Sequence, residues 1–316
     1  MKRRNFNIVG YRRVAYIFSG TLTVLAILAV VVPGWGLRYG IDFTGGSLLE
    51  VAFTGDRPVV ADIETALPSS LGKVDVTPVG SQGAVLRIGA KEGSAISDAD
   101  HELLVSTLKK KFGGEDGSKL TVERFTAIGP TIGAELRQNS ILALATVLGA
   151  IVLYIAWAFR KVSRPVPSWQ YGMAAIIALF HDTIITVGIF AVLGHFMGVE
   201  IDTLFITALL TLLGFSVHDT IVVFDRIREN LHHTTDSFAK VVNRSLNETM
   251  SRSLNTSLTT LLVLLFTLFF GGASSRYFVL ALVFGITFGT YSSIFIASPL
   301  LVSWYSWKEK RRLAQY

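Results

Sequence analysis

The chain of 316 residues contains no cysteine. Disulfide bonds, thiolate metal sites and cysteine nucleophiles are therefore excluded. The sequence also lacks the patterns G-x-x-x-x-G-K-[ST], His-Glu-x-x-His and G-x-S-x-G, which are typical of nucleotide-binding loops, zinc proteases and serine hydrolases. We expect a protein that is not an enzyme and holds no cofactor or metal. Any work it does must draw on an ion gradient or on a partner.

Charged residues are scarce as well. Only 16% of the residues are charged and 51% are hydrophobic, and the mean hydropathy is +0.51. This composition is typical of a membrane protein with several spans rather than of a soluble protein. The net charge of +6 is explained by basic loops that flank the spans, so we expect no nucleic-acid partner.

Six apolar segments reach the roughly 20 residues that a helix needs to cross a bilayer. They are Val14–Val32, Ile141–Phe159, Tyr171–Leu193, Thr203–Phe224, Leu254–Phe270 and Tyr277–Trp304. The first segment is long enough to span and no small-x-small cleavage site follows it, which favours a membrane helix over a signal peptide. Residues 33–140 separate the first span from the second, and only short loops separate the remaining spans.

Lysines and arginines in the short loops predict the orientation. One side of the predicted membrane carries Lys2, Arg3, Arg4, Arg12, Arg13, Arg160, Lys161, Arg164, Arg226, Arg228, Lys240, Arg244, Lys308, Lys310, Arg311 and Arg312. The opposite loops, Gly194–Asp202 and Gly271–Arg276, carry only Arg276. The positive-inside rule then places residues 1–13, the loop 225–253 and the tail 305–316 in the cytoplasm.

Residues 33–140 should consequently form a small α+β domain and its linker outside the cytoplasm. Patterning predicts strands at Ser47–Phe53, Val74–Val79, Ala84–Ile88 and Leu120–Ala127, and helices at Arg57–Leu71 and Ser97–Phe112. The order β-α-β-β-α-β is that of a ferredoxin-like domain. Ser97 is a plausible helix cap. The stretch Ile128–Ser140 should turn at Gly129-Pro130 and lead as a polar helix into the second span.

Two carboxylates lie inside the predicted spans. Asp219 stands between His218 and Thr220 in the fourth span, and the same triplet recurs in the third span with Asp182 after His181. An ionised aspartate at a bilayer centre costs about 2.5–3.5 kcal/mol, so one that is kept usually has a function. For Asp182, an interhelical hydrogen bond worth about 0.6–2 kcal/mol is an equally good explanation. For Asp219, function is favoured because a counter-charge is available.

That counter-charge is Arg252, near the start of the fifth span. A pair of Asp219 and Arg252 that breaks and reforms would act as a proton switch, whereas a permanent pair would be a structural strut. Arg252 could also be an interfacial residue whose charged end reaches the membrane surface. Thr256 and Thr260 give the fifth helix a hydroxyl-rich face, which either lines a path for water or, more commonly, satisfies backbone carbonyls. In the last span, Gly285 and Gly289 predict close helix packing.

Three segments resemble a known family. They are Gly40–Gly46 (GIDFTGG), Gly214–Asn230 and Ser251–Thr260. Their sequences and the six-span layout resemble the SecD/SecF family of bacterial protein-export subunits, on its SecF side, over nearly the whole chain. That family is expected to have asparagine just before the intramembrane aspartate, where this chain has His218. A histidine titrates close to neutral pH and could share the proton, or it could serve only as a neutral hydrogen-bond donor.

The resemblance implies one half of a twelve-span assembly in the bacterial inner membrane, related to the resistance-nodulation-division transporters. The other half would be a SecD-like protein, and the further partners would be the SecYEG translocon, an unfolded preprotein, membrane lipid and protons as the coupling ion. Asp219 and Arg252 would carry proton flow, with His218 and Thr220 as modulators. Two alternatives are half of a small-molecule efflux transporter and a structural stabiliser of the translocon.

The resemblance also bears on the residues that follow the first span. Asp42, Gly45 and Gly46 match its first motif. We expect them to shape the turn from the first span into the outer domain, because glycine tolerates positive φ angles.

Overall fold

The computed structural model describes residues 6–72, 74–89, 96–160, 165–272 and 275–314. The basic residues Lys2, Arg3, Arg4, Lys161 and Arg164 lie outside the described residues. The chain divides into two compact units. The first, which we call the helical unit, comprises Met1–Leu37, Ala143–Val199 and Leu204–Tyr316. The second, the sheet unit, comprises Arg38–Leu142 and Glu200–Thr203.

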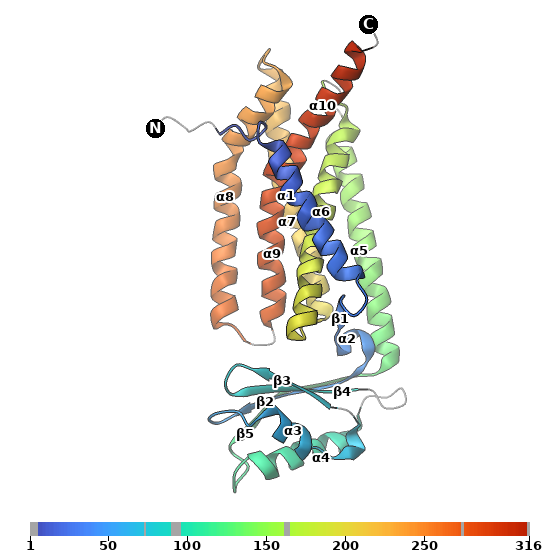
Figure 1. The fold of residues 1–316 in the computed structure, drawn as a ribbon, viewed down its shortest axis with the longest axis vertical. Helices are drawn as coiled ribbons and strands as arrows, with labels where there is room; N and C mark the ends of the chain where they lie inside the picture. Colours follow the sequence, from blue (N-terminus) through green and yellow to red (C-terminus); the bar gives the residue numbers. More distant parts are fainter. Residues whose placement is uncertain (1–5, 73, 90–95, 161–164, 273–274, 315–316) are drawn as a thin grey trace. The chain divides into compact units, whose positions relative to one another are not determined.

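The long helices follow the predicted spans (Figure 1). They are α1 (Arg12–Val31), α5 (Pro130–Ala158), α6 (Ser168–Met197), α7 (Thr203–His232), α8 (Phe238–Phe270), α9 (Arg276–Ser292) and α10 (Ser298–Leu313), and the π-helical turn Ser293–Ala297 joins the last two. In the described part of the chain, six helical segments are long and apolar enough to cross a membrane, with Arg276–Leu313 as the last. The prediction of six candidate spans is confirmed.

Several helices extend beyond the apolar segments. Most of the predicted loop 225–253 is helical, because α7 continues to His232 and α8 already begins at Phe238. Ion pairs stabilise these polar extensions: Arg226 Nε lies 2.6 Å from Glu248 Oε2, and Arg226 also bonds Glu229 one turn away at 2.7 Å. A hydropathy pattern detects the apolar length of a helix that crosses the bilayer, so it does not show where that helix continues into water.

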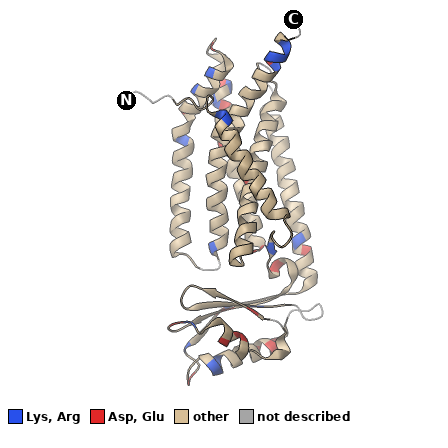
Figure 2. Cartoon of the chain, in the orientation of Figure 1, with Lys and Arg blue, Asp and Glu red and all other residues tan. Residues whose placement is uncertain are grey.

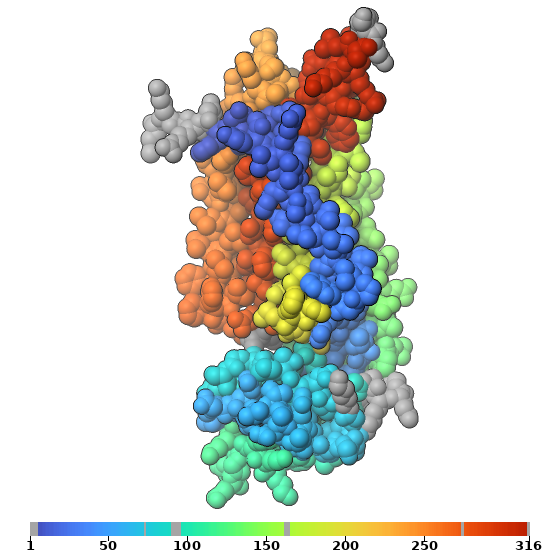
Figure 3. Space-filling model, in the orientation of Figure 1, coloured from blue at the N-terminus to red at the C-terminus, as the bar shows by residue number. Residues whose placement is uncertain are grey.

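Small residues allow the helices of this unit to pack closely. A Cβ atom added to Gly188 on α6 would lie 2.4 Å from Ala26 Cβ on α1. One added to Gly285 on α9 would lie 2.8 Å from Leu212 Cβ on α7, and one on Gly289 would lie 3.1 Å from Ser216 Cβ. The predicted role of Gly285 and Gly289 in close packing therefore agrees with the geometry. Figure 3 shows α1, in blue, lying across the surface of the bundle.

The sheet unit contains the strands β2 (Gly46–Phe53), β3 (Val74–Val79), β4 (Gly83–Ile88) and β5 (Leu120–Ile128), with the helices α3 (Val60–Ala66) and α4 (Asp98–Phe112) and the 3₁₀ turn η1 (Ser69–Leu71). The strands are antiparallel in the order β3-β4-β2-β5. The fully buried Leu49, Leu86, Leu104 and Leu108 form the core between the sheet and the helices.

Local chemistry explains how these elements begin and end. Ser97 Oγ accepts a hydrogen bond from the Asp100 backbone N–H at 3.2 Å, as the predicted cap should. The helix predicted over Arg57–Leu71 is instead split into α3 and η1, because Pro68 restricts the residue before it to extended backbone. The two-stranded pairing of β1 (Arg38–Tyr39) with β6 (Glu200–Ile201) was not predicted.

A polar site inside the helical unit

Asp219 lies where three helices meet. Its side chain on α7 is buried, with 8% of the residue exposed. Three hydroxyls face the carboxyl: those of Ser253 and Ser257 on α8 and that of Thr290 on α9. The oxygens of Ser257 and Thr290 are hydrogen-bonded at 2.5 Å. Hydroxyls can both donate and accept, so this surrounding can accommodate a carboxyl with or without its proton.

Ser253 and Arg252 are neighbours on α8 but face different surroundings. Ser253 is 2% exposed, and its Oγ faces Asp219 without completing a hydrogen bond to any described residue. Arg252 is exposed. Both Arg252 and Asp219 belong to the described residues, and no ion pair joins them. Successive residues of an α-helix point about 100° apart, so one face of α8 cannot present both side chains to the same carboxyl.

Arg252 instead lines a pocket of about 300 Å³. The other lining residues are Val222, Asp225, Arg226, Glu229, Glu248 and Thr249. This surrounding contains three carboxylates, which suit an arginine that extends from the bundle into a polar environment. The predicted pairing of Arg252 with Asp219 is thus not present in this structure, and a switching role for Arg252 stays a prediction.

The other predicted residues divide between the inside and the outside of the bundle. Thr220 is 1% exposed and lies inside, whereas His218 is exposed. Thr256 is exposed, and Thr260 Oγ1 donates to the Thr256 carbonyl one turn earlier at 3.1 Å. The hydroxyl of Thr260 therefore satisfies a backbone carbonyl, the commoner of the two interpretations. The serines at 253 and 257, not these threonines, face Asp219.

Asp182 on α6 is fully buried and joins three helices. Its Oδ2 accepts hydrogen bonds from Ser216 Oγ on α7 at 2.5 Å and from Ser292 Oγ on α9 at 2.7 Å. Its Oδ1 lies 2.9 Å from His181 Nδ1. Ser216 precedes Asp219 by three residues, so one face of α7 carries both Asp219 and the serine that donates to Asp182. Both carboxylate oxygens of Asp182 are thus engaged.

The hydroxyl partners were not recognised from the sequence as a set. Ser216, Ser253, Ser257, Thr290 and Ser292 come from three helices. Their spacing offers a signal, because Ser216 and Asp219 are three residues apart and the two serines of α8 are four apart, which places each pair on one helix face. Which faces meet depends on how each helix is rotated, and a single sequence does not contain that rotation.

The motif after the first span forms a tight turn in the sheet unit. Gly45 has φ +76° and Gly46 has φ +125°, angles that residues with a Cβ atom rarely adopt. A Cβ atom on Gly45 would also lie 2.8 Å from Pro130 Cα. Asp42 Oδ2 accepts hydrogen bonds from Thr203 N at 3.0 Å and from Thr203 Oγ1 at 2.6 Å, where α7 begins. Asp42 thereby serves a helix N-terminus from a distant part of the chain.

Glu200 is a partly buried acid of the sheet unit. Its carboxylate lies 2.8 Å from Arg87 Nε on β4. Burial raises the pKa of Glu200 above its ordinary value, and the neighbouring Arg87 and Arg38 only partly offset that rise. Within the described residues, no group of three or more His, Asp or Glu side chains is placed to hold a metal ion.

Six apolar helices, two carboxylates enclosed by hydroxyls and a compact α+β unit together define a polytopic membrane protein with a polar site in its bundle. Comparison with known proteins identifies the family. Residues 107–307 match the family described as protein export membrane protein SecD/SecF, C-terminal, and residues 36–56 match the SecD/SecF GG motif. The chain belongs to the SecD/SecF family, as its motifs predicted.

Individual relatives agree with this assignment. The chain is 45% identical over 317 residues to the protein translocase subunit SecF of Thermobaculum terrenum, covering 94% of this chain and 93% of that one. It is 39% identical over 321 residues to the protein translocase subunit SecDF of Thermus thermophilus, covering 98% of this chain but only 39% of the relative. The crystal structure of SecDF from Thermus, described as a translocon-associated membrane protein, superposes with a TM-score of 0.80 at 35% identity, over 95% of this chain and 39% of that chain.

Proposed function

We propose that this chain is the SecF-type subunit of a bacterial protein-export machine, and that it couples proton flow through the inner membrane to preprotein release on the outer side. Its relatives are named protein translocase subunits. The observation that carries the coupling is Asp219, a buried carboxyl among hydroxyls from two neighbouring helices. Acidic residues inside an apolar bundle commonly act as proton carriers in membrane transport.

Rotation of α8 would couple the loss of a proton from Asp219 to a movement of the helix. Protonated Asp219 is neutral, and the hydroxyls of Thr290 and Ser257 can satisfy its hydrogen bonds. Once the proton leaves, the buried charge attracts Arg252, which a rotation of α8 by about 100° would bring to the position of Ser253. A proton that crosses 100 mV releases about 2.3 kcal/mol, which biases two states by roughly fifty-fold. His218 and Thr220, on either side of Asp219, would modulate the exchange.

A SecD-like partner would complete this path. Arg252, Asn255, Thr256 and Thr259 are all exposed on α8. Polar side chains at membrane depth are usually covered by protein or by water rather than by lipid. The SecDF relative, which continues well beyond the part that this chain matches, supports a SecD-like protein as the cover. The SecYEG channel and an unfolded preprotein would be the further partners.

The sheet unit would be the part that handles the preprotein outside the cytoplasm. Its order of elements and its strand order β3-β4-β2-β5 support a ferredoxin-like domain. In the helical unit, Lys and Arg gather at the end that carries both chain termini (Figure 2), which supports cytoplasmic termini. We propose that Asp42, Gly45 and Gly46 hold the turn between the first span and this domain.

The decisive experiment changes Asp219→Asn in the chain reconstituted with its SecD-like partner and SecYEG in vesicles. We expect preprotein release to lose its response to an imposed proton gradient, because an amide cannot exchange a proton. The control is Glu309→Gln, which removes a negative charge from an exposed position of α10 outside the pocket of Arg252. Arg252→Gln should resemble Asp219→Asn, whereas a response that survives in Asp219→Asn would remove the coupling role.

The same variant separates the alternatives when it is tested both in these vesicles and in cells. A sodium gradient in place of the proton gradient identifies the ion, for which we expect protons. If Asp219→Asn exports normally but the protein is needed for assembly, the chain is a structural stabiliser. If the variant secretes normally and cells become sensitive to small toxic compounds, the chain is half of an efflux transporter.

A further inference from the structure

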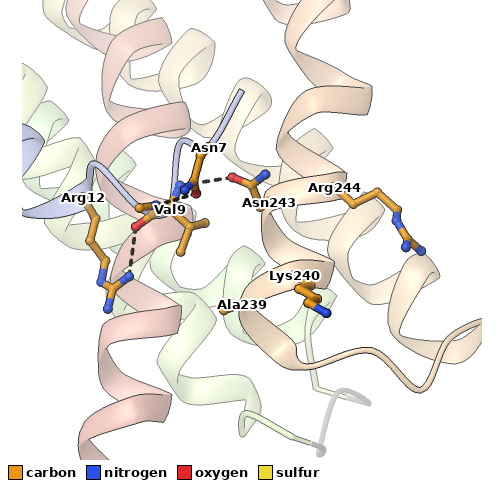
Figure 4. A pocket seen from close by; sticks show the side chains of 8 residues that line it. Asn7, Val9, Arg12, Ala239, Lys240, Asn243 and Arg244 are labelled. Atoms are coloured by element: carbon orange, nitrogen blue, oxygen red, sulfur yellow. Dashed lines mark hydrogen bonds between the residues drawn. The ribbon is translucent and has the colours of Figure 1, made fainter. Parts of the chain in front are cut away.

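A second pocket lies apart from Asp219, between the segment that precedes α1 and the first turns of α8 (Figure 4). Its volume is about 440 Å³. The lining residues are Asn7, Val9, Gly10, Arg12, Ala239, Lys240, Asn243 and Arg244. We call it the basic pocket; all of its residues belong to the helical unit.

Two asparagines of α8 fix one wall of the basic pocket. Asn247 Oδ1 accepts from Phe6 N at 2.8 Å, and its Nδ2 donates to the Phe6 carbonyl at 2.9 Å. Asn243 Nδ2 donates to the same carbonyl at 3.0 Å, and its Oδ1 accepts from Val9 N at 3.2 Å. Ile8 and Val9 are buried behind this contact. The backbone of the segment is therefore held on α8 before any ligand arrives.

The charge of the basic pocket is unbalanced. None of its lining residues is acidic. Arg244 is paired with Asp236 at 2.7 Å, but in the described part of the chain neither Arg12 nor Lys240 forms an ion pair. Arg12 donates one N–H to the Val9 carbonyl at 2.9 Å and keeps its remaining donors. Cations held together in one concave site favour an anion with several acceptor oxygens, and phosphate fits arginine and lysine donors well.

Aromatic residues near the basic pocket indicate the level of a membrane surface. Phe238, next to the pocket-lining Ala239, packs against Tyr305 on α10, with ring centroids 5.1 Å apart. Tyr305 adjoins Trp304, which contacts Trp169 at 5.4 Å, and tryptophan and tyrosine gather at the level of lipid headgroups.

The lipid-facing part of α1 begins just after Arg12, where Val14, Ile17 and Phe18 are exposed. These apolar side chains point away from Arg12, because residues two, five and six positions further along a helix lie about 140–240° around its axis. Arg12 therefore stands at the end of the apolar part of α1, at the level of lipid headgroups.

We propose that the basic pocket binds the phosphate of an anionic phospholipid headgroup. Binding would hold the N-terminal segment and the start of α8 on the lipid. Basic pockets between membrane helices recognise anionic headgroups through this combination of charge and depth.

The test measures lipid retention by native mass spectrometry on the full chain, purified in detergent and supplied with phosphatidylglycerol or phosphatidylcholine. We expect preferential retention of phosphatidylglycerol, and roughly ten- to thirty-fold weaker retention in the double variant Lys240→Gln, Arg244→Gln. The matched control is Lys308→Gln, Arg312→Gln on α10, which removes two exposed charges outside the pocket. It should bind as the unchanged chain does.

Inorganic phosphate forms the third arm of the experiment. If millimolar phosphate displaces phosphatidylglycerol completely, the source is the free anion and the lipid proposal is overturned. Equal retention of both lipids, or equal losses in the pocket variant and the control, would overturn it too. Arg12→Gln supplies an independent variant, because it leaves α8 unchanged and should weaken retention as well.

Discussion

The two carboxylates of the bundle differ in how completely their oxygens are bonded. Asp182 accepts from Ser216 and Ser292 and contacts His181, all within 2.9 Å. The hydroxyls around Asp219 are partly committed to each other, as the bond between Ser257 and Thr290 shows. A fully bonded carboxylate fixes its helices, whereas a less committed one can change partners. We infer that Asp182 is the structural aspartate of the pair and Asp219 the variable one.

The first prediction concerns Asp182→Ala. This change leaves the hydroxyls of Ser216 and Ser292 without their acceptor inside the bundle. We expect a loss of about 1–3 kcal/mol or more in the free energy of unfolding, measured by thermal unfolding in detergent. Asp182→Asn keeps an acceptor and should lose less. Thr183→Ala is the control, because its hydroxyl bonds the Leu179 carbonyl of its own helix at 2.9 Å. Equal stabilities of Asp182→Ala and the control would contradict this role.

At this scale the sequence predicted which acids are unusual but not what surrounds them. A carboxylate inside an apolar stretch is conspicuous, because its burial is costly wherever it points. Serine and threonine are common in membrane helices, so Ser253 and Thr290 stand out only once three helices have been placed. For the same reason the sequence predicts Arg252 as the partner of Asp219, from its charge and its place in the neighbouring span, whereas Ser253 occupies the facing position in the structure.

Among the elements, α1 is attached to the bundle chiefly through α6. Gly188 approaches Ala26 so closely that an added Cβ atom would lie 2.5 Å from Ala26 Cα and 2.4 Å from its Cβ. Neither atom can rotate out of the way, because both belong to a rigid helix. A larger residue must therefore push the two helices apart.

The second prediction follows from this contact. Gly188→Ala should lower the stability of the detergent-solubilised chain by about 1–3 kcal/mol through overpacking. Gly149→Ala, on α5 with open space around it, is the matched control and should be neutral or slightly stabilising because alanine favours helix. A disulfide between cysteines introduced at exposed positions of α1 and α6 would report the separation. Unchanged cross-linking and stability in Gly188→Ala would show that the helices adjust without cost.

The third prediction uses the contact of β6 with β4. Because burial raises the pKa of Glu200, its proton is held more tightly in the folded than in the unfolded chain. Folding is favoured while Glu200 is protonated in both states, and stability falls as the pH rises from its ordinary value of 4.5 through the raised value. Glu200→Gln should remove that fall, so the variant should gain stability relative to the unchanged chain as the pH rises above 4.5.

Thermal unfolding followed at several pH values measures this difference. Glu64→Gln, at an exposed position of α3, controls for the loss of a negative charge alone. A difference between the Glu200→Gln variant and the unchanged chain that does not depend on pH would contradict the linkage.

Element boundaries were predicted best where local chemistry sets them. The strand Val74–Val79 has its predicted bounds, and Ser97 caps α4 as expected, because alternation and capping are properties of a few consecutive residues. The pairing of β1 with β6 joins segments that are some 160 residues apart, and neither two-residue strand has a pattern of its own. Such a contact becomes visible only in the fold.

On the scale of the whole molecule, the helical unit leaves polar side chains of a membrane helix exposed on its surface. The exposed side chains of Asn255, Thr256 and Thr259 on α8 have no cover within the described chain. The fourth prediction is that Asn255→Leu with Thr259→Val weakens copurification with a SecD-like partner several-fold, because the replacements remove polar contacts between helices. The control pair, Ile141→Leu with Leu153→Val on α5, keeps an exposed face apolar. Equal copurification of both pairs would place the partner elsewhere.

The contact between the N-terminal segment and α8 also determines when that segment can be fixed during synthesis. Val9 leaves the ribosome well before its hydrogen-bond partner Asn243, which follows 234 positions later. At about 5–20 residues per second, the segment waits roughly ten to fifty seconds before that bond can form. The segment before α1 is therefore fixed late, and its contact with α8 forms only once the fifth span has been synthesised.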